Sequence, residues 1–245
     1  MIEELLEVQT QDGGMETFIV FPDGGDTHPV IVIYMDAPAI REELYDFARR
    51  IAAEGYYVAL PDLYYRRGRV RFDVAHMSAA DREEMFEHMN SLSNGMVIED
   101  TRALLVAIKN EPAASDGPKG CIGYCMSGQF VMSVAGTFPE HFRASVSCYG
   151  VRIVSDEADS PHRLAAQLQG EIFFAFAETD EYVPDGVVDT LRAALEEHGA
   201  LHQIEVYPGT EHGFCFPERS WCYAEDAAED VWRKSFEMWQ RQLRA

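Results

Sequence analysis

The segment Gly-Tyr-Cys-Met-Ser-Gly at 123–128 has the outline of a sharp strand-to-helix turn that carries a nucleophile. Such a turn needs small residues two places before and two places after the nucleophile, because strand and helix pack closely around it. Centred on Cys125, these positions hold Gly123 and Ser127. Centred on Ser127, one of them holds the bulky Gln129. The spacing therefore favours Cys125 as the nucleophile and gives Ser127 a packing role.

The predicted position of Cys125 also suits a reactive thiol. It would lie at the start of a helix, where unpaired N–H groups and the helix dipole favour a thiolate. A free cysteine is also often a small buried hydrophobic residue. The turn by itself leaves both interpretations open.

Two more stretches follow apolar segments and carry groups that could assist Cys125. "AETDEYVP" (177–184) comes directly after the apolar run 171–176 and offers the acids Glu178, Asp180 and Glu181. Asp180 lies just past the predicted end of the strand. An isolated acid in such a loop is more often a turn or capping residue.

The third stretch is "PGTEHGF" (208–214), in which His212 sits in a glycine-flanked loop. Glycine permits the backbone conformations that deliver a general base from a loop. The three stretches follow the chain order nucleophile, acid, histidine, which is that of the α/β-hydrolase triad. In this hypothesis Cys125 attacks a carbonyl, His212 takes the thiol proton, and Asp180 holds the tautomer of His212.

An oxyanion hole requires two N–H donors near the attacked carbonyl. One is expected from Met126, directly after the nucleophile, and the other from Ala37, in the loop after the apolar run "VIVIYM". The preceding Asp36 either takes part in this site or caps the helix that begins near residue 40.

The rest of the chain predicts one α/β domain over 1–245, with a doubly wound, mostly parallel sheet and helices on both faces. A polar excursion about 65–93 contains a helix around "SAADREEMFEHM". Ligands of such sheets bind at the carboxyl ends of the strands. Strands are expected at 15–21, 29–35, 56–64, 119–124, 144–150, 171–177 and 201–208, and helices at 39–55, 95–111, 126–138, 183–199 and near the C-terminus.

Composition narrows the function classes. The net charge of −22 and the pI near 4.6 argue against a nucleic-acid partner. No apolar run reaches the roughly 18–20 residues that span a bilayer. Five cysteines without a disulfide-like spacing fit a reducing, cytoplasmic setting. Cys121 and Cys125 lack the spacing of a zinc site or of a Cys-x-x-Cys redox pair, so we expect no metal.

The chain resembles the dienelactone hydrolase family, the carboxymethylenebutenolidase-like α/β-hydrolases. The resemblance covers nearly the whole sequence and is carried by its motifs. They are "PDLYYR" (61–66), "GYCMSGQF" (123–130), "SCYGV" (147–151), "ETDEYVP" (178–184) and "GTEHGF" (209–214). It implies hydrolysis of a small-molecule lactone or ester, with no metal or organic cofactor, no membrane and a monomer or small homo-oligomer. It also implies Cys125, Asp180 and His212 as the triad, with Ala37 and Met126 as oxyanion donors.

The resemblance extends to residues around the nucleophile. The family's type member has a glutamate that contacts the resting cysteine, and Asp36 corresponds to it here. The type member holds its substrate carboxylate with two arginines. Arg82 corresponds to the first, and Phe216 stands at the position of the second, four residues after the histidine. Tyr149, in "SCYGV", is expected to border the substrate.

Several aromatic residues are further candidates for an apolar pocket, of which we expect about half at best to face substrate. They are Tyr34, Tyr64, Tyr65, Phe214, Phe216 and Trp221. Two alternatives to a lactone or ester hydrolase stay open: the same triad acting on another ester or a thioester, and a catalytically silent binding protein with this fold.

Overall fold

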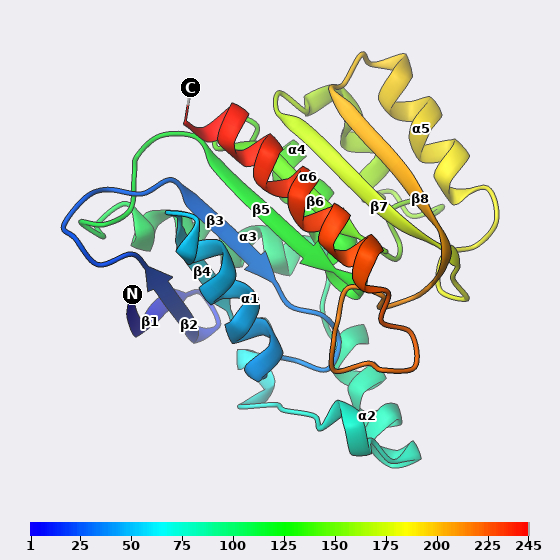
Figure 1. The fold of residues 1–245 in the computed structure, drawn as a ribbon, viewed down its shortest axis with the longest axis horizontal. Coiled ribbons are helices and arrows are strands. Elements are labelled where there is room, and N and C mark those ends of the chain that lie inside the picture. The colour runs from blue at the N-terminus through cyan, green and yellow to red at the C-terminus, as the bar shows by residue number, and fades with distance from the viewer. Residues whose placement is uncertain (245) are drawn as a thin grey trace.

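Eight strands form one sheet, with helices on both of its faces (Figure 1). The computed structural model describes residues 1–244. The order of the strands is β1-β2-β4-β3-β5-β6-β7-β8. The pairs β1–β2 and β2–β4 are antiparallel, and all other neighbouring pairs are parallel. The strands are β1 (Ile2–Thr10), β2 (Gly13–Phe21), β3 (Val30–Tyr34), β4 (Tyr57–Pro61), β5 (Lys119–Tyr124), β6 (Phe142–Cys148), β7 (Glu171–Thr179) and β8 (His202–Glu211). This confirms the predicted mostly parallel α/β sheet.

The strand β1 is the one element of the sheet that the sequence pattern did not predict. It lies at the edge and pairs with β2 along its whole length, from Ile2 opposite Phe21 to Thr10 opposite Gly13. Most of its residues are exposed, and Val8 alone is buried. Hydrogen bonds to β2 hold β1 in the sheet, so its sequence needs no apolar face.

Two helices cover one face of the sheet, and three cover the other. The helices α1 (Glu42–Ala53) and α6 (Glu225–Leu243) lie on one face, while α3 (Asn94–Ile108), α4 (Gly128–Thr137) and α5 (Val187–Glu197) lie on the other (Figure 1). A 3₁₀-helix at Pro161–Gln167 packs beside α4 and α5. No helix within residues 1–244 is long and apolar enough to cross a membrane.

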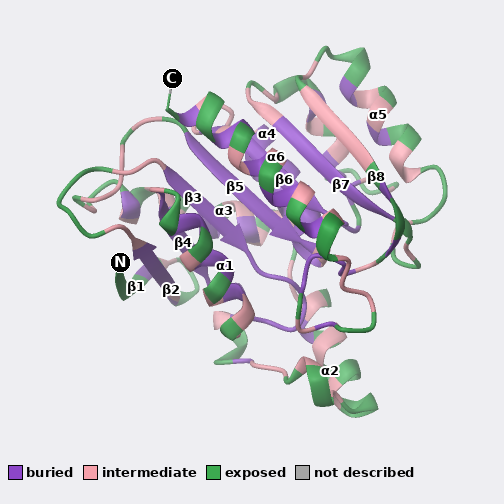
Figure 2. Ribbon diagram, in the orientation of Figure 1, coloured by how far each residue is buried: buried purple, intermediate pink, exposed green. Residues whose placement is uncertain are grey.

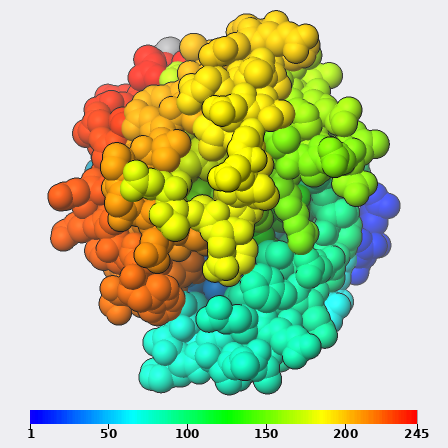
Figure 3. Space-filling model, turned by 90° about the vertical axis from the view of Figure 1, so that its right-hand side faces the viewer, coloured from blue at the N-terminus to red at the C-terminus, as the bar shows by residue number. Residues whose placement is uncertain are grey.

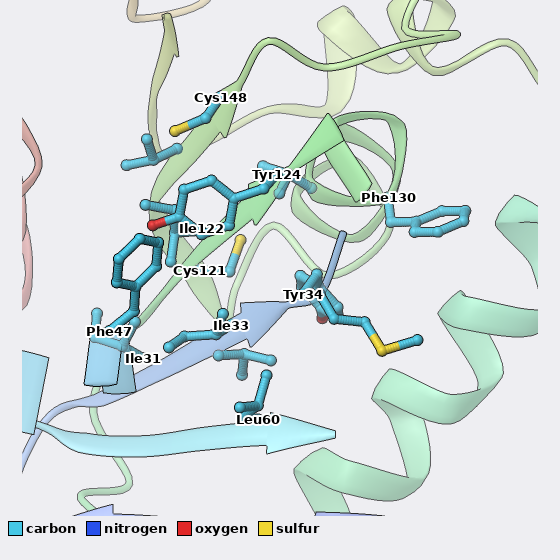
Figure 4. Close-up of a cluster of buried hydrophobic side chains, with 14 of the residues drawn as sticks. Ile31, Ile33, Tyr34, Phe47, Leu60, Cys121, Ile122, Tyr124, Phe130 and Cys148 are labelled. Atoms are coloured by element: carbon cyan, nitrogen blue, oxygen red, sulfur yellow. The ribbon is translucent and has the colours of Figure 1, made fainter. Parts of the chain in front are cut away.

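The core lies on both sides of the central strands β3 and β5 (Figure 4). On the α1 face, the ring centroid of Phe47 is 5.5 Å from that of Tyr124 and 5.2 Å from that of Trp232. On the other face, the Tyr34 hydroxyl lies 2.8 Å from the Thr101 hydroxyl of α3. Each large apolar side chain buried in this way stabilises the fold by about 1.5–3 kcal/mol.

The predicted excursion between β4 and α3 contains one regular helix, α2 (Ala79–Asn90), and two single-turn 3₁₀-helices, Tyr65–Arg67 and Val74–His76. A capping box starts α2: the Ser78 side chain accepts from the N–H of Asp81, and the Asp81 carboxylate accepts from the N–H of Ser78. The helix stands away from the sheet (Figure 1) and is largely exposed or half-buried (Figure 2). His88 is its one buried residue. The excursion therefore contributes little to the main core, in which Val70 is its one buried apolar residue.

Candidate active site

Cys125 lies at the sharp turn between β5 and α4. Its φ of 55° is in the left-handed region, which non-glycine residues rarely adopt. A Cβ at position 123 would come within 2.8 Å of the Ser127 carbonyl oxygen, so only glycine fits there. The Ser127 side chain is buried, and its hydroxyl donates to the Met35 carbonyl. Ser127 thus has the structural role that the spacing predicted, and the partly exposed thiol belongs to Cys125.

The turn is held between the ends of its two neighbouring strands. Its bond from Ser127 to Met35 reaches the end of β3. On the other side the Val151 N–H donates to the Cys125 carbonyl at 3.1 Å. A Cβ on Gly128 would lie 2.1 Å from the Cα of Gly150, so the start of α4 touches the chain after β6 backbone to backbone. These contacts hold the Cys125 thiol in place at the carboxyl end of the sheet.

The next two strand ends bring Asp180 and His212 together. Nδ1 of His212 and Oδ2 of Asp180 are 2.7 Å apart, and the other Asp180 oxygen accepts the Tyr182 N–H at 3.0 Å. Of the three acids in that loop, Glu178 instead accepts the N–H of Gly209. The structure thus pairs His212 with Asp180, as the sequence predicted.

The arrangement leaves one ring nitrogen of His212 available. With Nδ1 donating to Asp180, Nε2 is buried without a hydrogen-bond partner among residues 1–244. Burial by itself disfavours the charged ring. The neighbouring Cys125 and the Asp180 carboxylate outweigh it and raise the pKa of His212 to about 10. The charge that Cys125 carries as a thiolate is thus the largest influence that raises the pKa of the imidazole.

Cys125 and His212 open into a cavity of about 860 Å³. Its walls come from the excursion 65–93, the segment after β7 and the segment after β8, which meet in the space-filling view (Figure 3). The other residues that line it include Ala37, Pro38, Val74, Met77, Arg82, Met85, Phe86, Met89, Val151, Arg152, Glu181, Tyr182, Glu211, Arg219 and Trp221.

Ala37 and Met126 flank the thiol from two different loops. Ala37 lines the cavity after β3, and Met126 follows Cys125 in the 3₁₀-turn Cys125–Ser127. The buried hydroxyl of Tyr64 connects them: its oxygen lies 3.0 Å from the Ala37 carbonyl oxygen and 3.2 Å from the Met126 sulfur. Its single hydrogen can be donated to one of these acceptors at a time. Tyr64 therefore ties the two loops to each other beneath the thiol.

Asp36 differs from its expected role as an acid that contacts the nucleophile. It is fully buried, and its carboxylate accepts from Arg41 at 2.6 and 3.1 Å and also from Arg219. Burial alone would raise the pKa of Asp36, but the two guanidinium groups hold it below its usual value. Two arginines compete for this carboxylate far better than a thiol does, so the predicted contact with Cys125 is not formed.

Arg219 is the residue of this site that the sequence analysis missed. It follows His212 by seven positions in an irregular loop, where no periodicity indicates its direction. The loop turns back on itself, so the buried Arg219 side chain reaches the cavity and lies close enough to Cys125 for their charges to interact. Arg82 also lines the cavity, is exposed, and forms no ion pair with any of residues 1–244.

Two predicted substrate-binding residues do not reach the cavity. Phe216 is fully buried, with its ring 5.0 Å from Phe47, and the guanidinium groups of Arg41 and Arg219 stack on it at 4.9 and 4.5 Å. It supports the arginines instead of touching substrate. Tyr149 is also fully buried, with its ring 5.0 Å from that of His212. The Tyr149 ring packs against the His212 ring on the side that faces the core.

At most about half of the six aromatic candidates were expected to face the pocket, and fewer do. Of the six, only Trp221 lines the cavity, and it is 62% exposed. Tyr34, Tyr64 and Phe214 are core residues. The Tyr65 hydroxyl bonds to Asp100 at 2.8 Å, away from the thiol. Apolar composition alone does not tell a strand residue from one in a loop over the site.

Comparison with known proteins shows the family of the chain. Residues 15–243 match the model of the dienelactone hydrolase family. The chain belongs to this family. A "Putative carboxymethylenebutenolidase" of Methylorubrum extorquens is 26% identical over 97% of the chain and 80% of its own length. A protein of the same name from Synechocystis is 24% identical over 98% of the chain and 97% of its own length.

A solved structure titled "Putative Dienelactone Hydrolase", from Klebsiella pneumoniae, has the same fold. Its TM-score is 0.85 at 22% identity, and the alignment covers 98% of each chain. Family membership makes this chain a hydrolase of the class that acts on carboxylic ester and lactone bonds.

The buried charges around Asp36 yield a prediction for stability. Replacing Asp36 by Ala leaves Arg41 and Arg219 buried without their shared carboxylate, and should lower the free energy of unfolding by about 3–5 kcal/mol. Urea denaturation measures the change. Asp46→Ala is the control, because its ion pair with Arg49 is exposed and should contribute less than about 1 kcal/mol. Equal effects of the two variants would contradict the buried network.

The coupling of His212 to Cys125 yields a prediction for pH titration. The wild-type imidazole should keep its proton until the pH approaches about 10. Cys125→Ser removes the thiol whose charge is the largest influence that raises this pKa, so the variant should lose the proton at a clearly lower pH. NMR of the ring protons measures both, with the exposed His198 as an internal reference. An unchanged His212 titration in the variant would refute the coupling.

Proposed function

We propose that this chain is a cysteine-dependent hydrolase of a lactone or carboxylic ester that bears an anionic group. One observation carries the proposal: Nδ1 of His212 is held by Asp180 at 2.7 Å, while Nε2 has no partner in the described chain and shares a cavity with Cys125. A ring fixed in this way can exchange a proton with the thiol, with a leaving group or with water. Cys125 is the one cysteine among the described residues that line the cavity.

The first half of the reaction forms a thioester. With Asp180 held on Nδ1, Nε2 of His212 takes the proton of the Cys125 thiol, and the sulfur attacks the carbonyl carbon as a thiolate. The N–H groups of Ala37 and Met126 stabilise the negative oxygen of the tetrahedral intermediate. The bond to the alcohol oxygen then breaks, and Nε2 of His212 protonates that oxygen. In a lactone the alcohol stays attached, and the ring opens.

The second half of the reaction releases the acid. Acylation removes the charge of Cys125, which is the largest influence raising the pKa of His212. Burial then favours the neutral ring, so His212 becomes a base that can take a proton from water. The resulting hydroxide attacks the thioester, the sulfur leaves, and the carboxylic acid departs. The same histidine thus serves as acid and then as base because the charge beside it changes.

Two of the three arginines that line the cavity, Arg82 and Arg219, favour a substrate that bears an anionic group. The whole chain is strongly acidic, with a net charge of −22, yet Arg82 and Arg219 both line the cavity. Arg82 has no carboxylate partner among the residues described, so its charge is free to attract one. Phe216 stands at the position of the type member's second arginine and carries no charge, so Arg219 supplies the second guanidinium group instead. Charge-assisted bonds from these groups would orient a carboxylate next to the ester.

Replacing the nucleophile tests this function. Cys125→Ala should lower kcat on a small activated ester and on an enol-lactone by at least about 10³-fold, because the covalent route is lost. Mass spectrometry of the wild-type protein mixed rapidly with ester should show an acyl adduct on the peptide that contains Cys125. Cys222→Ala is the matched control, since that thiol lies outside the cavity.

Two outcomes would contradict the proposal. Full activity in Cys125→Ala would rule out the thioester route. An inactive wild type across a panel of lactones, esters and thioesters would instead favour a silent binding protein.

Tyr64 yields a further prediction for the oxyanion loops. Tyr64→Phe removes the hydroxyl that joins Ala37 and Met126, and we expect kcat to fall by about tenfold with KM little changed, because only the transition state uses the oxyanion donors. The adjacent Tyr65→Phe is the control, since its hydroxyl bonds to Thr10 and Asp100 outside the cavity. Parallel losses of kcat in both variants would point to a general structural effect.

A further inference from the structure

One face of α2 is apolar but is only partly covered by protein. Arg82, Met85, Phe86 and Met89 have the spacing i, i+3, i+4, i+7 and all line the cavity. In α1 the same spacing, Leu44, Phe47, Ala48 and Ile51, is buried against the sheet with at most 6% exposure. The three apolar residues on α2 are only half-buried. The face of α2 therefore meets the cavity where the face of α1 meets protein.

Aromatic rings continue from α2 across the cavity to the reacting centre. The Phe86 ring lies 6.4 Å from that of Tyr182, and the Tyr182 ring lies 4.8 Å from that of His212. These three rings therefore lead from the reacting centre to α2. Val151 and the 62%-exposed Trp221 line the same space. An apolar group that begins at Cys125 would pass along this row of rings.

The side chains on this face indicate what kind of group fits. Met77, Met85 and Met89 are unbranched and polarizable, so they adapt to ligands of different shape. The cavity volume of about 860 Å³ lies near the upper end of the roughly 300–1,000 Å³ typical of small-molecule sites. A surface of this kind favours an extended alkyl or aryl group more than a small polar ring.

We propose that the cavity-facing side of α2, formed by Met85, Phe86 and Met89 together with Met77, is a binding site for an extended apolar arm of the substrate. The proposal rests on the proposed function only in taking Cys125 as the place where the reacting bond lies. It assigns the substrate to amphipathic esters, in which a medium-length alkyl chain or an aryl group is attached to the cleaved bond.

The first experiment measures kcat/KM for p-nitrophenyl esters of acetate, butyrate, hexanoate and octanoate. For the wild type, kcat/KM should rise by about tenfold or more from acetate to octanoate, because each methylene that leaves water adds to binding. Phe86→Ala combined with Met89→Ala should flatten this rise while leaving acetate hydrolysis nearly unchanged. Met96→Ala is the matched control, a half-buried methionine on α3 that does not line the cavity.

A second experiment needs no turnover. Calorimetric titration of Cys125→Ala with butanoate and octanoate should show tighter binding of octanoate by about tenfold or more. The preference should disappear when Phe86→Ala and Met89→Ala are added. Ester hydrolysis without any chain-length preference would overturn the α2 site and leave the proposed function intact. A chain-length preference in binding by a protein that hydrolyses none of the esters would support the site and overturn the proposed function.

Discussion

The close approach of the backbone around Cys125 is the constraint on which the site depends. The turn after β5 touches the end of β3 through Ser127 and Met35, and the chain after β6 through Gly128 and Gly150. No side chain fits between these segments, so the nucleophile is forced into its positive φ and projects above the sheet. The neighbouring loops are thereby placed around one thiol, because each of them contacts the turn itself or the adjacent strand.

Buried charged side chains also hold the loops around the site to one another. Asp36 after β3 binds Arg41 before α1 and Arg219 in the loop after β8, and Phe216 lies beneath both guanidinium groups. The loop that carries His212 is thus attached to the loop that carries Ala37. Breaking such a pair would leave a buried charge uncompensated, which makes the arrangement rigid. The same cluster brings a cation to the cavity of an acidic protein, which bears on the substrates that can enter.

The excursion 65–93 has a different role from the elements of the sheet. It adds little to the core, and α2 directs toward the cavity the face that α1 directs toward the sheet. Catalysis and selectivity are therefore built by separate parts of the chain. The strand ends hold the reacting groups, and the excursion supplies a wall whose side chains can vary without disturbing them.

The sequence by itself determined the alternation of strands and helices, the turn at Cys125, and the order of Cys125, Asp180 and His212, because these depend on local spacing and on the polarity of a parallel sheet. It missed β1, whose place comes from hydrogen bonds to β2. Only the tertiary structure decided that Asp36 binds two arginines, that Phe216 and Tyr149 lie beneath the site, and that Arg219 enters it. Those outcomes depend on which loop side chains meet across the strand ends, and spacing along the chain carries no information about distances between separate loops. For α2 the sequence predicted a helix, but only the fold shows that Met85, Phe86 and Met89 line a cavity.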